Sequence, residues 1–195
     1  MPEQGAGETA RWLRSLGSLQ GTPPPFTIAA APDHPVPLFR DWMHAAAQSA
    51  VPEPAAVTLS TVDAEGMPDA RTLILKDFTA SGRWAVAGPR SSGKAAQLAA
   101  HPVAALSFWW QPIMRAVRMR GPIVEGTSDE IAADLAARPV RGGVTVDEWM
   151  VWWVDAVRVE FWQGAEDRNH LRLVYERVDG VWRHGLHTPG GAGRE

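Results

Sequence analysis

The sequence contains no cysteine among its 195 residues, and it contains only one tyrosine. Without thiols, a disulfide framework and thiolate metal sites are excluded. The formal net charge of −3 does not favour a surface that binds nucleic acid or membrane lipid. No run is long and apolar enough to cross a bilayer, and residues 1–21 lack the apolar core of a signal peptide. We therefore expect a cytoplasmic protein with neither a nucleic-acid nor a membrane partner.

The composition is that of an ordinary globular domain, with 45% hydrophobic and 21% charged residues. Ten tryptophans are unusual for this length. Packing in a core or an interface explains most of them, although a flat aromatic cofactor also favours tryptophan. The six histidines show no metal-ligand spacing with carboxylates, so we expect no metal site.

The composition also divides the chain. Residues 1–32 are rich in glycine, proline and alanine, and we interpret them as a flexible arm with a short helix near Ala10–Leu16. Residues 33–189 carry the apolar patterns of one folded domain. We expect residues 190–195 to be a disordered tail.

Short alternating segments dominate the folded part. They predict strands at 55–62, 70–76, 83–87, 103–110, 115–124, 154–162, 171–177 and 180–186. Helical spacing predicts helices at 37–49 and 94–100, and a capping box at Thr127–Glu130 opens another that runs to Arg138. The fold class is therefore mainly β with helical insertions, built as an antiparallel barrel.

Two segments are candidates for binding an anion. The strand Arg71–Lys76 has a cation at each end, although a regular pleat places the two on opposite faces. Ser92 and Lys94 lie at the start of a predicted helix, where backbone N–H groups favour a phosphate. The next residue, Ala95, lacks the hydroxyl that a nucleotide hydrolase uses to bind Mg²⁺. Each segment alone is more often an ordinary surface feature.

A third segment is richer in candidate residues. Glu160–Gly164 contains Trp162, and it is followed by Arg168, His170 and Arg172. If the chain is extended here, these three side chains point the same way, which suits an anionic aromatic ligand. A solvated edge strand beside a structural tryptophan explains the segment equally well.

These residues together resemble the pyridoxamine 5'-phosphate oxidase family, which has an FMN-binding split β-barrel. The likeness runs from about Asp33 to Pro189. It rests on an opening helix with Trp42, the strand Arg71–Lys76, and the C-terminal segment that ends with Arg168-x-His170-x-Arg172.

The resemblance implies an FMN-dependent oxidase, in which hydride passes from the C4' carbon of the substrate to flavin N5 and oxygen is the acceptor. It implies a homodimer with FMN at the interface. For the cofactor, it assigns the FMN phosphate to Arg71, Ser92 and Lys94, and the flavin to the backbone of Thr72, Leu73, Ile74 and Leu75. The rest of the FMN pocket is assigned to Trp162 and Arg172 of a partner. For the substrate, it assigns the phosphate to Lys76 and Arg138, and the ring to Arg168 and His170.

The sequence departs from the family pattern at several of these places. Gly93 replaces a phosphate-binding arginine, and a helical segment after Pro139 is missing. In the substrate-phosphate site, Asp134 replaces a tyrosine and Gly142 replaces a serine, and a carboxylate there repels a phosphate. The cofactor site is thus better preserved than the substrate site.

Three hypotheses stay open. The chain oxidises pyridoxine or pyridoxamine 5'-phosphate; or it oxidises another small heterocycle, as the related phenazine-pathway oxidases do; or it binds FMN or pyridoxal phosphate without turnover. Arg168 and His170 favour an enzyme, whereas Asp134 and the missing segment favour a binding protein.

Overall fold

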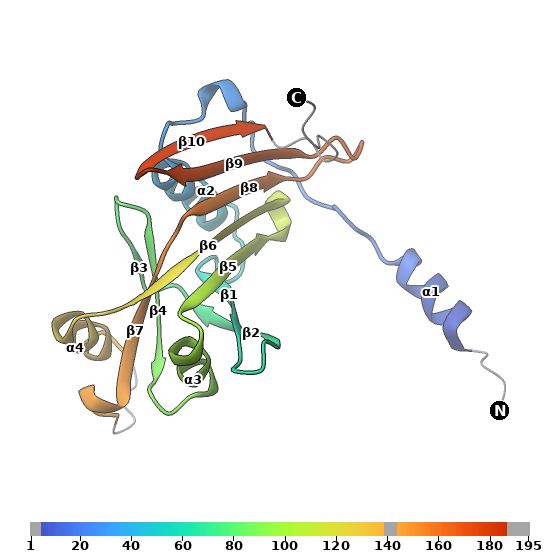
Figure 1. Cartoon of the computed structure of the whole chain (residues 1–195). Helices are drawn as coiled ribbons and strands as arrows, with labels where there is room; N and C mark the ends of the chain where they lie inside the picture. Colours follow the sequence, from blue (N-terminus) through green and yellow to red (C-terminus); the bar gives the residue numbers. More distant parts are fainter. Residues whose placement is uncertain (1–4, 139–143, 187–195) are drawn as a thin grey trace, which may run out of the picture.

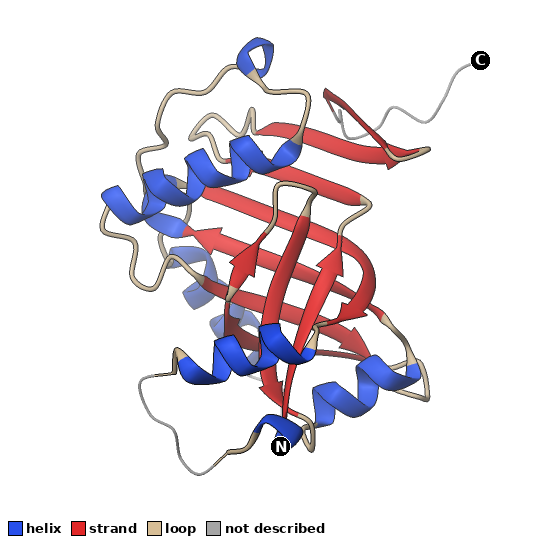
Figure 2. Ribbon diagram, turned by 90° about the vertical axis from the view of Figure 1, so that its left-hand side faces the viewer, coloured by secondary structure: helices blue, strands red, loops and turns tan. Residues whose placement is uncertain are grey.

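The structure, a computed structural model, describes residues 5–138 and 144–186. Within these residues, ten strands pair entirely antiparallel, and three of the four α-helices pack around them, while the first helix stands apart (Figures 1 and 2). The strands are β1 (Ala56–Val62), β2 (Pro68–Ile74), β3 (Asp77–Phe78), β4 (Arg83–Pro89), β5 (Val103–Trp110), β6 (Arg115–Glu125), β7 (Trp149–Asp155), β8 (Arg158–Gln163), β9 (Leu171–Val178) and β10 (Val181–Leu186). The helices are α1 (Gly5–Ser15), α2 (Pro35–Gln48), α3 (Gly93–Ala100) and α4 (Ser128–Ala136). The predicted fold class, mainly β with helical insertions in an antiparallel split barrel, is confirmed.

Strand β6 joins the two parts of the half-barrel. Its first residues pair with β8 in the sheet of order β10-β9-β8-β6-β5-β1-β2, and its last residues pair with β7, which continues to β4 and β3. Gly121 lies between the two pairings, where a Cβ would overlap the carbonyl oxygen of Asp155. The close backbone approach therefore requires glycine at this bend.

Helix α2 closes the open side of the half-barrel. Phe39 is completely buried, and its ring lies 5.1 Å from Phe78, 5.3 Å from Phe108 and 5.6 Å from Trp84. Trp42 packs edge-on against Phe161 at 5.2 Å. Six of the ten tryptophans are buried in this core or beside it: Trp42, Trp84, Trp110, Trp149, Trp152 and Trp153. Most tryptophans thus serve packing, as the composition suggested.

The segment before α2 contacts the sheet, whereas α1 projects away from it (Figure 1). Pro24 accepts a hydrogen bond from Arg115 at 3.0 Å, and Pro32 accepts one from Tyr175 at 2.8 Å. Phe26 packs against Trp42 at 5.5 Å. The division into a flexible arm, a domain and a disordered tail stays a prediction. No helix among the described residues is long and apolar enough to span a bilayer.

The prediction of a single strand at 154–162 was wrong. The structure has two strands, β7 and β8, separated at Ala156 and Val157. Six residues from Trp149 to Val154 are all buried, so β7 lacks the alternation by which a half-exposed strand is recognised. The two-residue strand β3 was also not predicted.

Local capping and turn chemistry was predicted correctly. Thr127 accepts a hydrogen bond from the Glu130 N–H, and the Glu130 side chain accepts one from the Thr127 N–H, so the capping box is confirmed. Asp179 and Gly180 both have positive φ, at 51° and 79°, as a two-residue hairpin turn requires.

The turn between β9 and β10 provides a stability prediction. Gly180→Ala should lower the free energy of unfolding by about 1 kcal/mol, because alanine is strained at positive φ. Gly185→Ala is the matched control, since it lies in β10 with equally open space and no positive φ. Urea unfolding measures both variants; equal effects would show that the turn geometry is not what Gly180 contributes.

Candidate functional site

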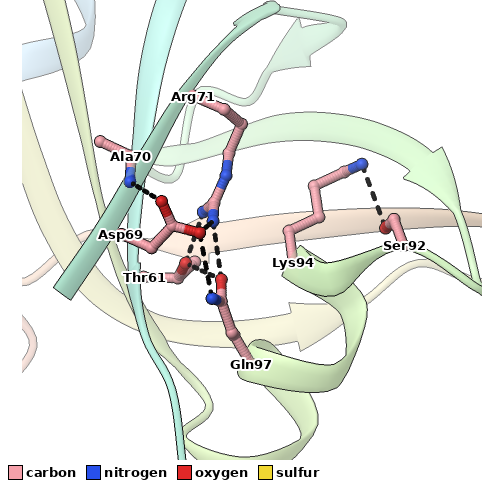
Figure 3. Close-up of polar contacts among 7 residues, drawn as sticks. All are labelled: Thr61, Asp69, Ala70, Arg71, Ser92, Lys94 and Gln97. Carbon is pink, nitrogen blue, oxygen red and sulfur yellow. Dashed lines mark hydrogen bonds and ion pairs between the residues drawn. The ribbon is translucent and has the colours of Figure 1, made fainter. Parts of the chain in front are cut away.

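Arg71 on β2 lies in a network of polar side chains (Figure 3). Its guanidinium donates to Thr61 on β1, to Asp69 at 2.5 Å and to Gln97 on α3 at 2.7 Å. Gln97 in turn donates to Asp69 at 3.1 Å, and its hydrogen bond is the main reason that the pKa of Asp69 is lowered, followed by those of the Ala70 N–H and by Arg71. The network fixes Arg71 between two strands and a helix.

Lys94 lies beside this network in the first turn of α3. Figure 3 shows its side chain between Arg71 and Ser92, with the ammonium donating to the Ser92 hydroxyl at 3.2 Å. The ammonium also lies 5.8 Å from the centre of the Trp152 ring. It has no carboxylate partner in residues 5–138 and 144–186, although burial disfavours an unpaired charge.

The two cations influence each other. Burial lowers the pKa of Lys94 from 10.5, and the positive charge of Arg71 lowers it further. A Cβ at Gly88 would overlap the Lys94 ammonium, so glycine at this position of β4 makes room for the lysine. A half-buried lysine at the start of a helix, near a second cation and without a carboxylate partner in the described chain, is a candidate site for an anion such as a phosphate. We refer to Arg71, Lys94 and Ser92 as the cation pocket.

The backbone of β2 lies next to the cation pocket. This strand is the edge of its sheet, and an edge strand has backbone groups free to bond a ligand. Thr72 and Ile74 are exposed, and Leu73 is partly buried. The Leu75 N–H donates to the Ala55 carbonyl at 2.9 Å, and the assignment of residues 72–75 to the flavin stays a prediction.

A second cluster lies at the other side of the sheet. The Trp162 ring on β8 lies 4.9 Å from the His170 ring and 5.9 Å from Trp109, which is 50% exposed. His170 accepts a hydrogen bond from the Ala165 N–H at Nδ1, 3.1 Å away, so the neutral ring carries its proton on Nε2. We refer to Trp109, Trp162 and His170 as the aromatic cluster.

The extended segment expected at 168–172 was wrong. Strand β9 begins at Leu171, and Arg168 has a φ of 67° in a turn. The turn is closed by the Arg168 N–H, which donates to the Ala165 carbonyl, and by Asn169, which bonds to Asp167. Arg168, which is exposed, therefore does not share one strand face with His170 and Arg172.

Arg172 bonds to a buried carboxylate. Glu160 is only 3% exposed, and its oxygens accept from Arg172 at 2.5 Å, Arg118 at 2.9 Å and Arg158 at 3.2 Å. Burial raises the pKa of Glu160, but the hydrogen bond and charge of Arg118 and then the charges of Arg172 and Arg158 outweigh it, so the pKa is lowered below 4.5. Arg172 is thus held beside its cross-strand neighbour, Trp162.

One chain does not bring the cation pocket and the aromatic cluster together. Arg71 is on β2 and Trp162 on β8, with β1, β5 and β6 between them. Four steps of about 4.8 Å separate the two strands by about 19 Å. The predicted cofactor residues therefore form two groups, on strands that are four positions apart in the sheet.

The predicted substrate residues meet in a third group. Lys76 forms an ion pair with Asp134 on α4, 3.6 Å apart, and Trp149 donates to the other oxygen of Asp134 at 2.8 Å. The Arg138 guanidinium lies over the Trp149 ring, 4.1 Å from its centre. Lys76 thus contacts the Asp134 carboxylate directly, whereas Arg138 contacts Trp149, which bonds that carboxylate. Gly142 and the segment after Pro139 lie outside the described residues, so the prediction about them stays a prediction.

Several contacts of these groups were not found from the sequence. Thr61 and Gln97 bond Arg71 only because β1 and α3 pack against β2, which no local pattern indicates. Asp69 could have been found, since alternation places it on the same strand face as Arg71. The indole of Trp152 under Lys94 likewise depends on the pairing of β4 with β7, a strand that was placed wrongly.

The buried carboxylate yields a second stability prediction. Glu160→Gln should lower the free energy of unfolding by about 3 kcal/mol at neutral pH, because three arginines lose their buried counter-ion. Since the pKa is lowered in the folded state, this contribution is present above pH 4.5 and lost as the pH falls below it. Glu176→Gln, which removes only a 61% exposed partner of Arg158, is the control. Urea unfolding at neutral and acidic pH measures the stability of both variants. Equal changes in the free energy of unfolding for the two would contradict this account.

Comparison with known proteins places this geometry in a family. The family described as pyridoxamine 5'-phosphate oxidase matches residues 43–181. The pyridoxine/pyridoxamine 5'-phosphate oxidase of Caulobacter vibrioides (strain NA1000 / CB15N) is 33% identical over an alignment of 197 positions, which covers 84% of this chain and 87% of the relative.

Two solved structures are similar in fold. PhzG from Burkholderia lata 383, in complex with tetrahydrophenazine-1-carboxylic acid, has a TM-score of 0.79 at 20% identity and covers 87% of this chain and 100% of its own. A pyridoxamine 5'-phosphate oxidase-related, FMN binding protein from Nostoc punctiforme PCC 73102 has a TM-score of 0.64 at 21% identity, with coverages of 84% and 100%. The chain therefore belongs to the pyridoxamine 5'-phosphate oxidase family, whose members bind FMN in a split barrel.

Proposed function

We propose that this protein binds FMN and oxidises a small heterocyclic substrate with oxygen as acceptor. The cation pocket is the observation that carries the proposal. Lys94 is half-buried without a carboxylate partner in the described chain, beside Arg71 and at a helix start. Such an arrangement is costly unless an anion neutralises it, and the FMN phosphate supplies that anion.

In this proposal the backbone of residues 72–75 would hold the flavin ring, while Arg71, Ser92 and Lys94 would hold the phosphate. Bound FMN supplies the hydride acceptor, and the protein positions the substrate and excludes water. Trp162 and Arg172 complete the pocket from a second copy of the chain.

A homodimer follows from the separation of the two groups. Trp162 on β8 lies about 19 Å along the sheet from Arg71 on β2, so a single pocket that uses both residues needs two chains. The outer face of the sheet between them supports this proposal, because it exposes Trp109 and Val103 by 50% and 51%. Exposed apolar side chains of this size are typical of an interface. We also propose that the protein is cytoplasmic.

His170 and Arg168 act on the substrate in this proposal. The Ala165 N–H fixes His170 through Nδ1, which leaves the Nε2 proton to bond the substrate ring. Arg168 is exposed in the adjacent turn, so its guanidinium can reach an electron-rich substituent. Both residues orient the carbon that loses hydride.

Anaerobic mixing tests the proposed reaction. The purified protein, loaded with FMN, is mixed without oxygen with pyridoxamine, pyridoxine, their 5'-phosphates and a reduced phenazine carboxylic acid. Loss of the visible flavin absorption with one of them, and its return with oxygen, is the expected result. A flavin spectrum that no compound changes would favour a binding protein without turnover.

The lowered pKa of Lys94 gives a prediction for cofactor affinity. FMN affinity should fall as the pH rises and Lys94 loses its charge, and this fall should begin at a lower pH than for an ordinary lysine, because burial and the charge of Arg71 lower the pKa of Lys94. Lys94→Met should bind FMN roughly 10- to 100-fold more weakly at pH 7, since a charge-assisted bond is lost. The variant should lack the part of the pH dependence that is due to Lys94. Fluorescence titration with FMN measures both; identical pH profiles would remove Lys94 from the phosphate site.

His170→Ala should separate binding from turnover. We expect unchanged FMN affinity and about 100-fold slower anaerobic flavin reduction, because general positioning and proton transfer contribute about that factor. His44→Ala, an exposed histidine on α2, is the control. Stopped-flow absorbance measures the rates, and reduction of His170→Ala at the wild-type rate would place His170 outside the substrate site.

A further inference from the structure

The ion pair between Lys76 and Asp134 bears on which substrate the proposed oxidase accepts. We infer that the Asp134 carboxylate takes the place of a substrate phosphate and limits the substrate to ring compounds without a phosphate group. The inference rests on the proposed function, because it assigns Lys76 and Arg138 to the substrate.

Asp134 is fixed in its position by both of its oxygens. One forms the 3.6 Å ion pair with Lys76, and the other accepts the 2.8 Å hydrogen bond of the Trp149 indole. Trp149 is 5% exposed, so turning the carboxylate away would leave a buried donor without its partner. The Asp134 side chain itself is 13% exposed. The carboxylate therefore stays beside Lys76 when a ligand arrives.

The charges of this group do not suit a phosphate. Lys76 and Arg138 carry two positive charges, and Asp134 cancels one of them. A phosphate bonded to Lys76 would lie beside the Asp134 carboxylate, and two like charges at such a distance repel strongly. The cation pocket differs, because Lys94 there has no carboxylate partner in the described chain.

The positive charge of Arg138 determines which substrates can still bind beside Asp134. The guanidinium carbon lies over the Trp149 ring, 4.1 Å from the ring centre, and no ion pair of Arg138 is found in the described parts of the chain. One remaining positive charge suits a neutral ring or one with a single carboxylate. The relative from Caulobacter vibrioides is named for phosphorylated substrates, so this chain differs from it in substrate class.

Binding of matched ligands tests the inference. FMN-loaded wild type and Asp134→Asn are titrated by calorimetry with pyridoxamine and with pyridoxamine 5'-phosphate. Asparagine keeps an oxygen for the Trp149 hydrogen bond but removes the charge. We expect wild type to bind the phosphate form no more tightly than pyridoxamine, and Asp134→Asn to bind it at least about 10-fold more tightly than wild type does. Pyridoxamine affinity should be equal in both proteins.

Two further variants keep the result interpretable. Asp129→Asn removes an exposed charge from the same helix, and it should leave both affinities unchanged. Adding Lys76→Met to Asp134→Asn should abolish the gain for the phosphate form, since Lys76 then no longer attracts it. Melting temperatures of all variants show whether each is folded.

Two outcomes would overturn the inference alone. One is a wild type that already prefers the phosphate form by about 10-fold or more, and the other is an Asp134→Asn variant without any gain. The flavin absorption of the same samples tests the proposed function separately. Wild type that takes up no FMN would overturn the proposed function and, with it, the substrate assignment.

Discussion

Arg71 on β2 lies near Lys94 at the start of α3, and the rest of the proposed site depends on these two cations. Arg71 is paired with Asp69, whereas Lys94 has no carboxylate partner in the described chain, and burial and the charge of Arg71 both lower its pKa. A charged Lys94 is therefore costly in the absence of an anion. The fold supports the pair with specific contacts. Gln97 and Thr61 bond Arg71, and Gly88 leaves room for the Lys94 ammonium.

The half-barrel positions a second set of residues at its other side. Strands β1, β5 and β6 lie between Arg71 on β2 and Trp162 on β8, and the buried Glu160 holds Arg172 in place. One chain cannot close a pocket across this distance. In the proposed function a second copy of the chain supplies Trp162 and Arg172, so cofactor binding would be coupled to dimer formation.

Much of the fold could be predicted from the sequence, because its strands and caps follow local rules. The capping box at Thr127 and the turn at Asp179 are examples. Strand β7 could not be predicted, since a strand that is buried on both faces has no alternation. The turn at Arg168 was missed because its left-handed backbone suits asparagine or glycine better than arginine.

The candidate site was predictable only in part. Arg71 and Lys94 were found from their residue types and places in predicted elements. Their supporting contacts come from strands and helices far apart in sequence, which no local pattern specifies. Asp134 was identified as a departure from the family pattern, but its hydrogen bond from Trp149 depends on the packing of α4 against β7.

The central claim is that the cation pocket binds the phosphate of a flavin nucleotide. Comparing the dissociation constants of FMN and riboflavin for the purified apoprotein tests it directly, because the two ligands differ only in the phosphate. Two charge-assisted bonds predict that FMN binds at least about 100-fold more tightly. Equal affinities for the two flavins would contradict the account.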